Sequence, residues 1–132
     1  MSKFTEAELE YLKTQHIGRL ATVNKRGEPQ NNPVGFRYNA DLDVIEIGGP
    51  WNGKTQRFRN VVHNGLASFV VDDLTQEGGR GIEIRAHAEV FPEGGQLISP
   101  GFSPEVIRLV PRRIITWDLS RRLFPNAARN VE

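Results

Sequence analysis

The sequence predicts a mainly β protein, a closed antiparallel barrel of six or seven strands with only two helices. Three observations carry this prediction. Most apolar segments alternate polar and apolar side chains, as half-exposed antiparallel strands do. Short turns rich in glycine, asparagine or proline separate these segments. Only two segments have a helical period, and closing the barrel removes the edges that so short a sheet would otherwise expose.

The composition predicts one domain, residues 1–132, without disulfides or cysteine-ligated metals. The chain has 17 Lys+Arg against 16 Asp+Glu and no cysteine, so it is nearly neutral and has no thiolate chemistry. A neutral balance disfavours a nucleic-acid partner. No apolar run approaches the ~20 residues of a membrane helix, and the acidic segment Met1–Leu12 lacks the apolar region of a signal peptide. We therefore expect a cytoplasmic protein with no membrane contact and no metal site.

The first third of the chain is predicted to contain one helix and three strands. Thr5 and Glu8 have the spacing of a capping box, which starts a helix. Leu9, Leu12 and His16 share one face at helical spacing, so this helix should pack on a core. From Ile17 the period changes to two, and the expected strands are Ile17–Val23, Gln30–Tyr38 and Val44–Gly48.

The rest of the chain is predicted to add a second helix and the remaining strands. A glycine-rich loop opens a helix from Lys54 to His63, and Asn64-Gly65 ends it with a left-handed cap. The expected strands are Leu66–Val71, Gly81–Phe91, Val106–Val110 and Ile114–Leu119. The expected connections are a polar loop at Thr75–Gly81, a loop at Pro92–Pro104, a turn at Pro111–Arg113 and a loose tail over 120–132.

One motif favours a different function. Gly48–Thr55 matches the phosphate-binding pattern G-x-x-x-x-G-K-[ST] and lies between a strand and a helix, as in nucleotide hydrolases. Such an enzyme requires an open parallel sheet covered by several helices. The other strands of this chain alternate like antiparallel ones, and Pro50-Trp51 would strain a loop that wraps phosphates. The nucleotide hydrolase stays a distant alternative.

The same segment predicts an anion site whatever the family. A helix N-terminus offers unpaired N–H groups and a partial positive charge, which attract phosphate. Lys54, Thr55 and Arg57 add side-chain donors at that end, and arginine can bind phosphate in a bidentate way. Lys54 or Arg57 alone is better explained as an ordinary solvated helix residue, so the prediction depends on the cluster.

Several segments in order resemble the split-barrel flavin and deazaflavin oxidoreductases, the relatives of pyridoxamine-phosphate oxidase. The resemblance runs from Phe4 to Leu119 and is greatest to the small branch that depends on the deazaflavin coenzyme F-420. The segments that carry it are IGRLATV, GEPQNNPVGFRYN, GKTQRFRNVVHNGLASFVVDD, GIEIRAHAEVF and PRRIITWDL.

The resemblance implies a split barrel of the FMN-binding type, a homodimer and a cofactor, F-420 or alternatively FMN, at the subunit interface. It implies that the cofactor phosphate lies near the start of the second helix and the ring against strands two and three. It also implies that a tryptophan of the last strand approaches the site, either from the same chain or from the partner subunit. The implied cofactor-binding residues are Asn32, Pro33, Val34, Lys54, Thr55, Arg57, Asn60 and Trp117.

The implied function is an oxidoreductase that transfers hydride from the cofactor to an unsaturated small organic substrate. Because the cofactor ring carries the hydride chemistry, no catalytic side chain follows from the sequence, although His87 could protonate a substrate. The alternative is a non-catalytic protein that binds or carries a flavin or a tetrapyrrole in the same pocket.

Overall fold

The computed structural model describes residues 1–119 and 127–132. These residues form strands and short helices in an order close to the expected one. The helices are α1 (Glu6–Lys13) and α2 (Gln56–Asn64), with single 3-10 turns η1 (Asn52–Lys54) and η2 (Gly95–Leu97). The strands are β1 (Ile17–Val23), β2 (Pro29–Asn39), β3 (Val44–Gly48), β4 (Leu66–Thr75), β5 (Gly78–Phe91), β6 (Val106–Trp117) and β7 (Ala127–Asn130).

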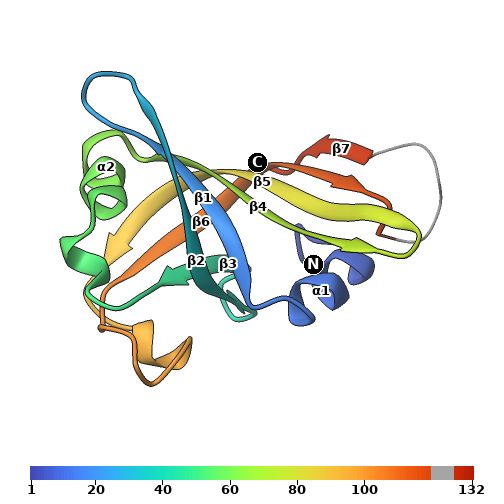
Figure 1. The fold of residues 1–132 in the computed structure, drawn as a ribbon, viewed down its shortest axis with the longest axis horizontal. Helices are drawn as coiled ribbons and strands as arrows, with labels where there is room; N and C mark the ends of the chain where they lie inside the picture. Colours follow the sequence, from blue (N-terminus) through green and yellow to red (C-terminus); the bar gives the residue numbers. More distant parts are fainter. Residues whose placement is uncertain (120–126) are drawn as a thin grey trace.

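The strands close into an antiparallel barrel. Their order is β3-β2-β1-β4-β5-β6-β7, and an additional pairing of β3 with β6 joins the two ends of the six-stranded part. Every pairing of the described strands is antiparallel. The predicted fold class is therefore confirmed, and the parallel sheet that a nucleotide hydrolase requires is not present in the described part of the chain. Helices α1 and α2 lie at opposite ends of the barrel (Figure 1).

The barrel interior is filled by the apolar face of each alternating strand. On β5, Ile82 and Ile84 are fully buried, whereas Glu83 and Arg85, which alternate with them, point outward. Phe69 of β4 lies at the centre, in a T-shaped contact with Phe36, with ring centroids 5.2 Å apart. The apolar side chains with no exposure are Leu20, Ile45, Ile47, Phe69, Val71, Ile82, Ile84, Val106, Ile107, Leu109 and Ile114.

The capping motifs of both helices form as expected, but the helix bounds differ from the prediction. The Thr5–Glu8 capping box is present, and Gly65 ends α2 in the left-handed region with φ 69°. Helix α1 ends at Lys13, so His16 lies in the following segment and not on the helix face. Helix α2 begins at Gln56, because Thr55 is its N-cap residue and Lys54 belongs to the preceding 3-10 turn.

The predicted turn at Pro111–Arg113 is wrong, because this segment lies inside the continuous strand β6. The register with β5 shifts here: Arg113 pairs with Arg85 and Pro111 with Ala86, so Arg112 has no opposite residue. This arrangement is a β-bulge. Proline has no N–H to donate to the ladder, and a bulge is one of the few places in a sheet where it is tolerated.

The predicted polar loop at Thr75–Gly81 is also mostly strand. Thr75 pairs with Gly78 and Asp73 with Arg80, so β4 and β5 form a hairpin whose turn is only Gln76 and Glu77. An ion pair joins these two polar strands: Arg80 Nε lies 2.9 Å from Asp73 Oδ1. The buried Tyr11 of α1 donates a hydrogen bond to the same carboxylate at 2.7 Å.

The expected loose tail does not hold for residues 127–132, whereas 120–126 lie outside the described residues. Strand β7 pairs with the end of β6, from Arg113–Asn130 to Thr116–Ala127. Arg129 binds the buried carboxylate of Glu8 on α1, with Nη2 to Oε1 at 2.6 Å and Nη1 to Oε2 at 2.7 Å. This ion pair joins the C-terminal segment to α1. No helix of the described residues has the length and apolar character needed to cross a membrane.

Candidate functional site

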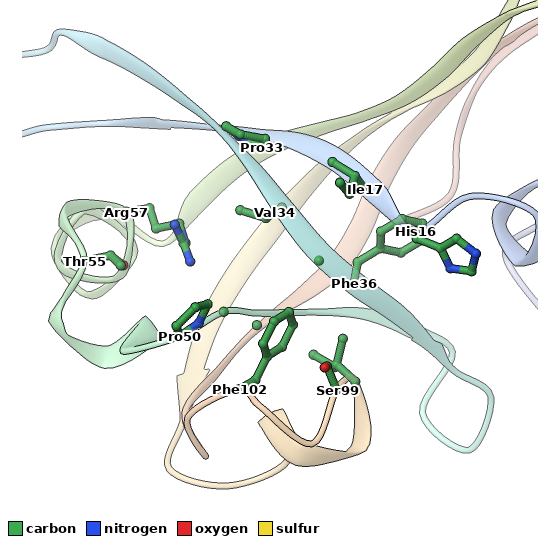
Figure 2. A pocket seen from close by; sticks show the side chains of 14 residues that line it. His16, Ile17, Pro33, Val34, Phe36, Pro50, Thr55, Arg57, Ser99 and Phe102 are labelled. Carbon is green, nitrogen blue, oxygen red and sulfur yellow. The ribbon is translucent and has the colours of Figure 1, made fainter.

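A cavity of about 570 Å³ opens between β2, β3, the start of α2 and the loop that contains η2. Its size is in the usual range of pockets for small molecules. Figure 2 shows Arg57 and Thr55 at one end, His16 at the other, and Pro50, Phe102 and Ser99 along one side. The lining residues are His16, Ile17, Pro33, Val34, Gly35, Phe36, Gly48, Gly49, Pro50, Thr55, Arg57, Ile98, Ser99 and Phe102.

The glycine-rich loop after β3 directs the start of α2 toward this cavity. Trp51 takes the left-handed conformation, with φ 50°, and the chain then makes one 3-10 turn before the helix. Thr55 caps the helix: its hydroxyl accepts from Phe58 N at 3.3 Å and donates to Asn52 O at 2.7 Å. The first amides of an α-helix have no backbone partner within the helix. In α2 the amide of Phe58 binds Thr55 Oγ1, and Thr55 and Arg57 both line the cavity.

Arg57 supplies a positive charge to the cavity wall. Its guanidinium lies so close to Gly49 that a Cβ added there would be 2.6 Å from Nη2, so a larger residue at position 49 would force the guanidinium to shift. Burial lowers the pKa of this guanidinium. None of the ion pairs among residues 1–119 and 127–132 involves Arg57. A partly desolvated cation without a carboxylate partner favours an anionic ligand.

Asn52 holds Arg57 in place, and the sequence analysis did not identify it. Its Oδ1 accepts hydrogen bonds from Nε of Arg57 at 3.1 Å and from Nη2 at 2.9 Å. Its Nδ2 donates to the carbonyls of Ile47 at 3.2 Å and Glu105 at 2.9 Å. The side chain is fully buried, so every one of these bonds replaces lost water. The only signal in the sequence was an asparagine inside a loop that precedes a helix.

We expect Asn52→Asp to weaken anion binding and to lower the free energy of unfolding by about 1–3 kcal/mol. The new carboxylate would neutralise Arg57 and could not donate to the two carbonyls that Asn52 binds. Fluorescence titration with FMN and F-420 measures the first effect, and urea denaturation measures the second. Asn31→Asp, at an exposed position of β2, is the matched control. Equal ligand affinity of the two variants would contradict this role for Asn52.

Four of the eight predicted binding residues line the cavity: Pro33, Val34, Thr55 and Arg57. Asn32 neighbours them on β2 and Lys54 precedes Thr55, but neither is among the lining residues. The Lys54 side chain is exposed. Whether any of these residues contacts a cofactor stays a prediction, but the structure separates Arg57, which lines the cavity, from Lys54, which does not.

Asn60 and Trp117 also lie outside the cavity lining. Asn60 is buried, and its amide donates to Thr22 Oγ1 at 3.0 Å and Gln30 Oε1 at 2.8 Å, which attaches α2 to the β1–β2 hairpin. Trp117 ends β6 opposite Gly81. Its predicted approach to the site from a partner subunit involves a second chain and stays a prediction.

Other cavity residues had not been identified from the sequence. His16 lines the cavity, whereas His87, the histidine considered for proton transfer, pairs with Glu132 at 3.2 Å and is not among the lining residues. Ile98, Ser99 and Phe102 come from the loop after β5, which has no regular period to indicate where its side chains point.

A closed antiparallel barrel with a cavity between β2, β3 and the start of α2 places this chain in the split-barrel class. The model of the family described as pyridoxamine 5'-phosphate oxidase matches residues 4–117. The chain therefore belongs to this family.

Comparison with known proteins shows a similar curated protein and similar solved structures. A 5a,11a-dehydrotetracycline/5a,11a-dehydrooxytetracycline reductase of Streptomyces rimosus is 43% identical over 119 residues, which cover 88% of this chain and 84% of the reductase. A solved F-420 reductase superposes with a TM-score of 0.66 at 22% identity, covering 84% of this chain and 98% of that one. The FAD binding protein of Mycobacterium smegmatis superposes with a TM-score of 0.62 at 19% identity, covering 86% of this chain and 92% of that one. The two structures show the shared fold, and the reductase supports an oxidoreductase function.

Proposed function

We propose that this protein is a reductase that uses the deazaflavin coenzyme F-420, or alternatively FMN, to reduce an unsaturated small organic substrate. The observation that carries the proposal is Arg57, a partly buried guanidinium with no carboxylate partner among the described residues, beside a largely apolar cavity. Both cofactors combine a flat ring system with a phosphate, which matches an apolar cavity with one cationic end. The 43% identical relative is itself named as a reductase.

Different residues along the cavity would contact the phosphate, the ring and the substrate. Arg57 and the first amides of α2 would hold the phosphate, with Asn52 fixing the direction of the guanidinium. Pro33, Val34 and Pro50 offer apolar contacts for a ring and keep water away from it. When bound, the deazaflavin or flavin ring supplies the hydride. At the other end, His16 and Ser99 are the polar side chains that could orient a substrate.

We further propose that the protein works as a homodimer whose second chain completes the cavity, with Trp117 as the candidate residue for this contribution. The support is the family to which the chain belongs together with the shape of the cavity, which is open to the surface in one chain.

The test is a fluorescence titration of the purified protein with F-420 and with FMN, followed by a turnover assay. We expect micromolar or tighter binding of one of them, and oxidation of reduced F-420 when 5a,11a-dehydrotetracycline is added as acceptor. Binding without turnover of this or other unsaturated acceptors would favour a carrier of the cofactor. Binding of neither would overturn the proposal, and magnesium-dependent release of phosphate from ATP would revive the hydrolase hypothesis.

A further inference from the structure

The loop of residues 94–104 forms one side of the cavity, between the end at Arg57 and Thr55 and the end at His16 (Figure 2). Ile98, Ser99 and Phe102 of this loop line the cavity. Figure 2 shows Phe102 standing beside Pro50 and Ser99, below the backbone of β2 and β3. This loop therefore determines how much space remains for a molecule bound next to the cofactor.

The ring of Phe102 rests on two glycines that face each other across the sheet. Gly35 of β2 and Gly48 of β3 are directly paired. A Cβ added to Gly35 would lie 2.7 Å from Cζ of Phe102, and one added to Gly48 would lie 2.8 Å from its Cδ2 and 2.9 Å from Cδ1 of Ile98. Any larger residue at either position would displace the Phe102 ring and its loop. The ring therefore packs directly against the backbone of the two glycines.

The hydrogen bonds of the loop hold its base and leave the rest to side-chain packing. At the base, Gly95 N donates to Pro104 O at 2.9 Å, and Ser103 donates to Gly49 O through its amide at 3.2 Å and its hydroxyl at 3.1 Å. Beyond the base, the amides of Ser99 and Phe102 donate only within the loop, to Gly95 O and Ser99 O. The position of the loop over the barrel therefore depends on Phe102 and Ile98.

We propose that Phe102, packed against the Gly35–Gly48 pair, is a specificity-determining residue that limits the size of the substrate. The proposal rests on the proposed function, because the cofactor phosphate at Arg57 leaves the Phe102 side for the substrate. An apolar pocket wall selects substrates by size, because it excludes substrates that are too large and makes few contacts with substrates that are too small.

Phe102→Ala tests the wall directly. We expect the ratio of kcat/KM for 5a,11a-dehydrotetracycline, a four-ring substrate, to that for 2-cyclohexenone to rise about tenfold or more, the usual range for a change of this size in an apolar pocket. The Kd of F-420 should stay within about twofold, because Arg57 is untouched. Phe102→Leu should give an intermediate ratio, and it serves if the alanine variant folds poorly.

Equilibrium dialysis of 5a,11a-dehydrotetracycline with the cofactor-free protein gives a second readout. We expect tighter binding to Phe102→Ala than to the wild type. Absence of cofactor binding by the wild type would overturn the proposed function alone, because the dialysis measures the cavity without cofactor. Equal dialysis affinity in both proteins, or a larger change in F-420 affinity than in substrate ratio, would overturn the role of Phe102.

A double-mutant cycle tests the contact between Phe102 and the glycine pair. Gly35→Ala should displace Phe102 and change the substrate ratio. In the Phe102→Ala background the same substitution should have little further effect, because the nearest atoms to the new Cβ belong to the Phe102 ring and Ile98 Cγ2 is 4.0 Å away. Gly101→Ala, in the same loop with no atom within 4 Å of an added Cβ, is the matched control and should behave as the wild type. An effect of Gly35→Ala that is as large in the Phe102→Ala background as in the wild type would contradict the packing of this ring on the glycine.

Discussion

Replacing Arg57 with alanine is expected to weaken binding of F-420 or FMN about 10- to 150-fold. This range corresponds to the loss of about 1.5–3 kcal/mol for a hydrogen bond to a charged group. The guanidinium lines the cavity, is partly desolvated and has no carboxylate partner among the described residues, so the ligand phosphate would be its main counter-charge. Fluorescence titration of both cofactors measures the change.

Other substitutions at the same helix start separate Arg57 from its surroundings. Lys54→Ala should change affinity less than about threefold, because Lys54 is exposed and its charge is screened by water. Arg59→Ala is the matched control: Arg59 is exposed on the same helix, and its guanidinium binds Lys54 O and Gln56 Oε1. Arg57→Lys keeps the charge but not the bidentate geometry and should lie in between. Equal effects at Arg57 and Arg59 would show that the phosphate does not bind here.

Replacing Arg129 with methionine is expected to lower the free energy of unfolding by about 3 kcal/mol. Glu8 is only 2% exposed, and Arg129 binds both of its carboxylate oxygens as well as the carbonyl of Lys3 at 2.7 Å. Removing one member of a buried ion pair leaves an uncompensated charge, which usually costs about 3–5 kcal/mol. We expect a loss at the lower end of this range because the Arg129 side chain is 32% exposed, so water partly screens the pair. Urea denaturation measures the effect.

Two further variants show whether the cost comes from the isolated carboxylate. Asn130→Ala removes an exposed hydrogen bond of the same strand, to Arg113, and should cost no more than about 0.5 kcal/mol. Glu8→Gln with Arg129→Met removes both charges, and glutamine still completes the capping box with Thr5. This double variant should recover most of the lost stability. If the double variant is no more stable than Arg129→Met, the loss of stability comes from lost packing and not from the isolated carboxylate of Glu8.

Local sequence signals predicted the parts of the fold that depend on neighbouring residues. The alternation along 81–91 correctly gave the buried and exposed faces of β5. The Thr5–Glu8 spacing gave the start of α1, and Asn64-Gly65 gave the end of α2. Of the cavity residues, Thr55 and Arg57 could be proposed because a helix start and a cation attract anions whatever lies around them.

Residues that depend on distant contacts could not be predicted in this way. Pro111 looks like a turn residue, but the register with β5 places it at a bulge within one strand. Asn52 acts through the carbonyl of Glu105, far along the chain. Phe102 lines the cavity because two glycines of other strands leave room for its ring.

The sequence by itself therefore determined the fold class, the start of α1, the end of α2 and the cation near the start of α2. A local hydrophobic period shows which side of a segment is buried, and a local capping motif shows where a helix begins or ends. Only the tertiary structure decided that Asn52 orients Arg57, that Phe102 forms one side of the cavity, and that Arg129 joins the last strand to α1. These three depend on strand register and barrel closure, which bring together side chains from segments that no local pattern connects.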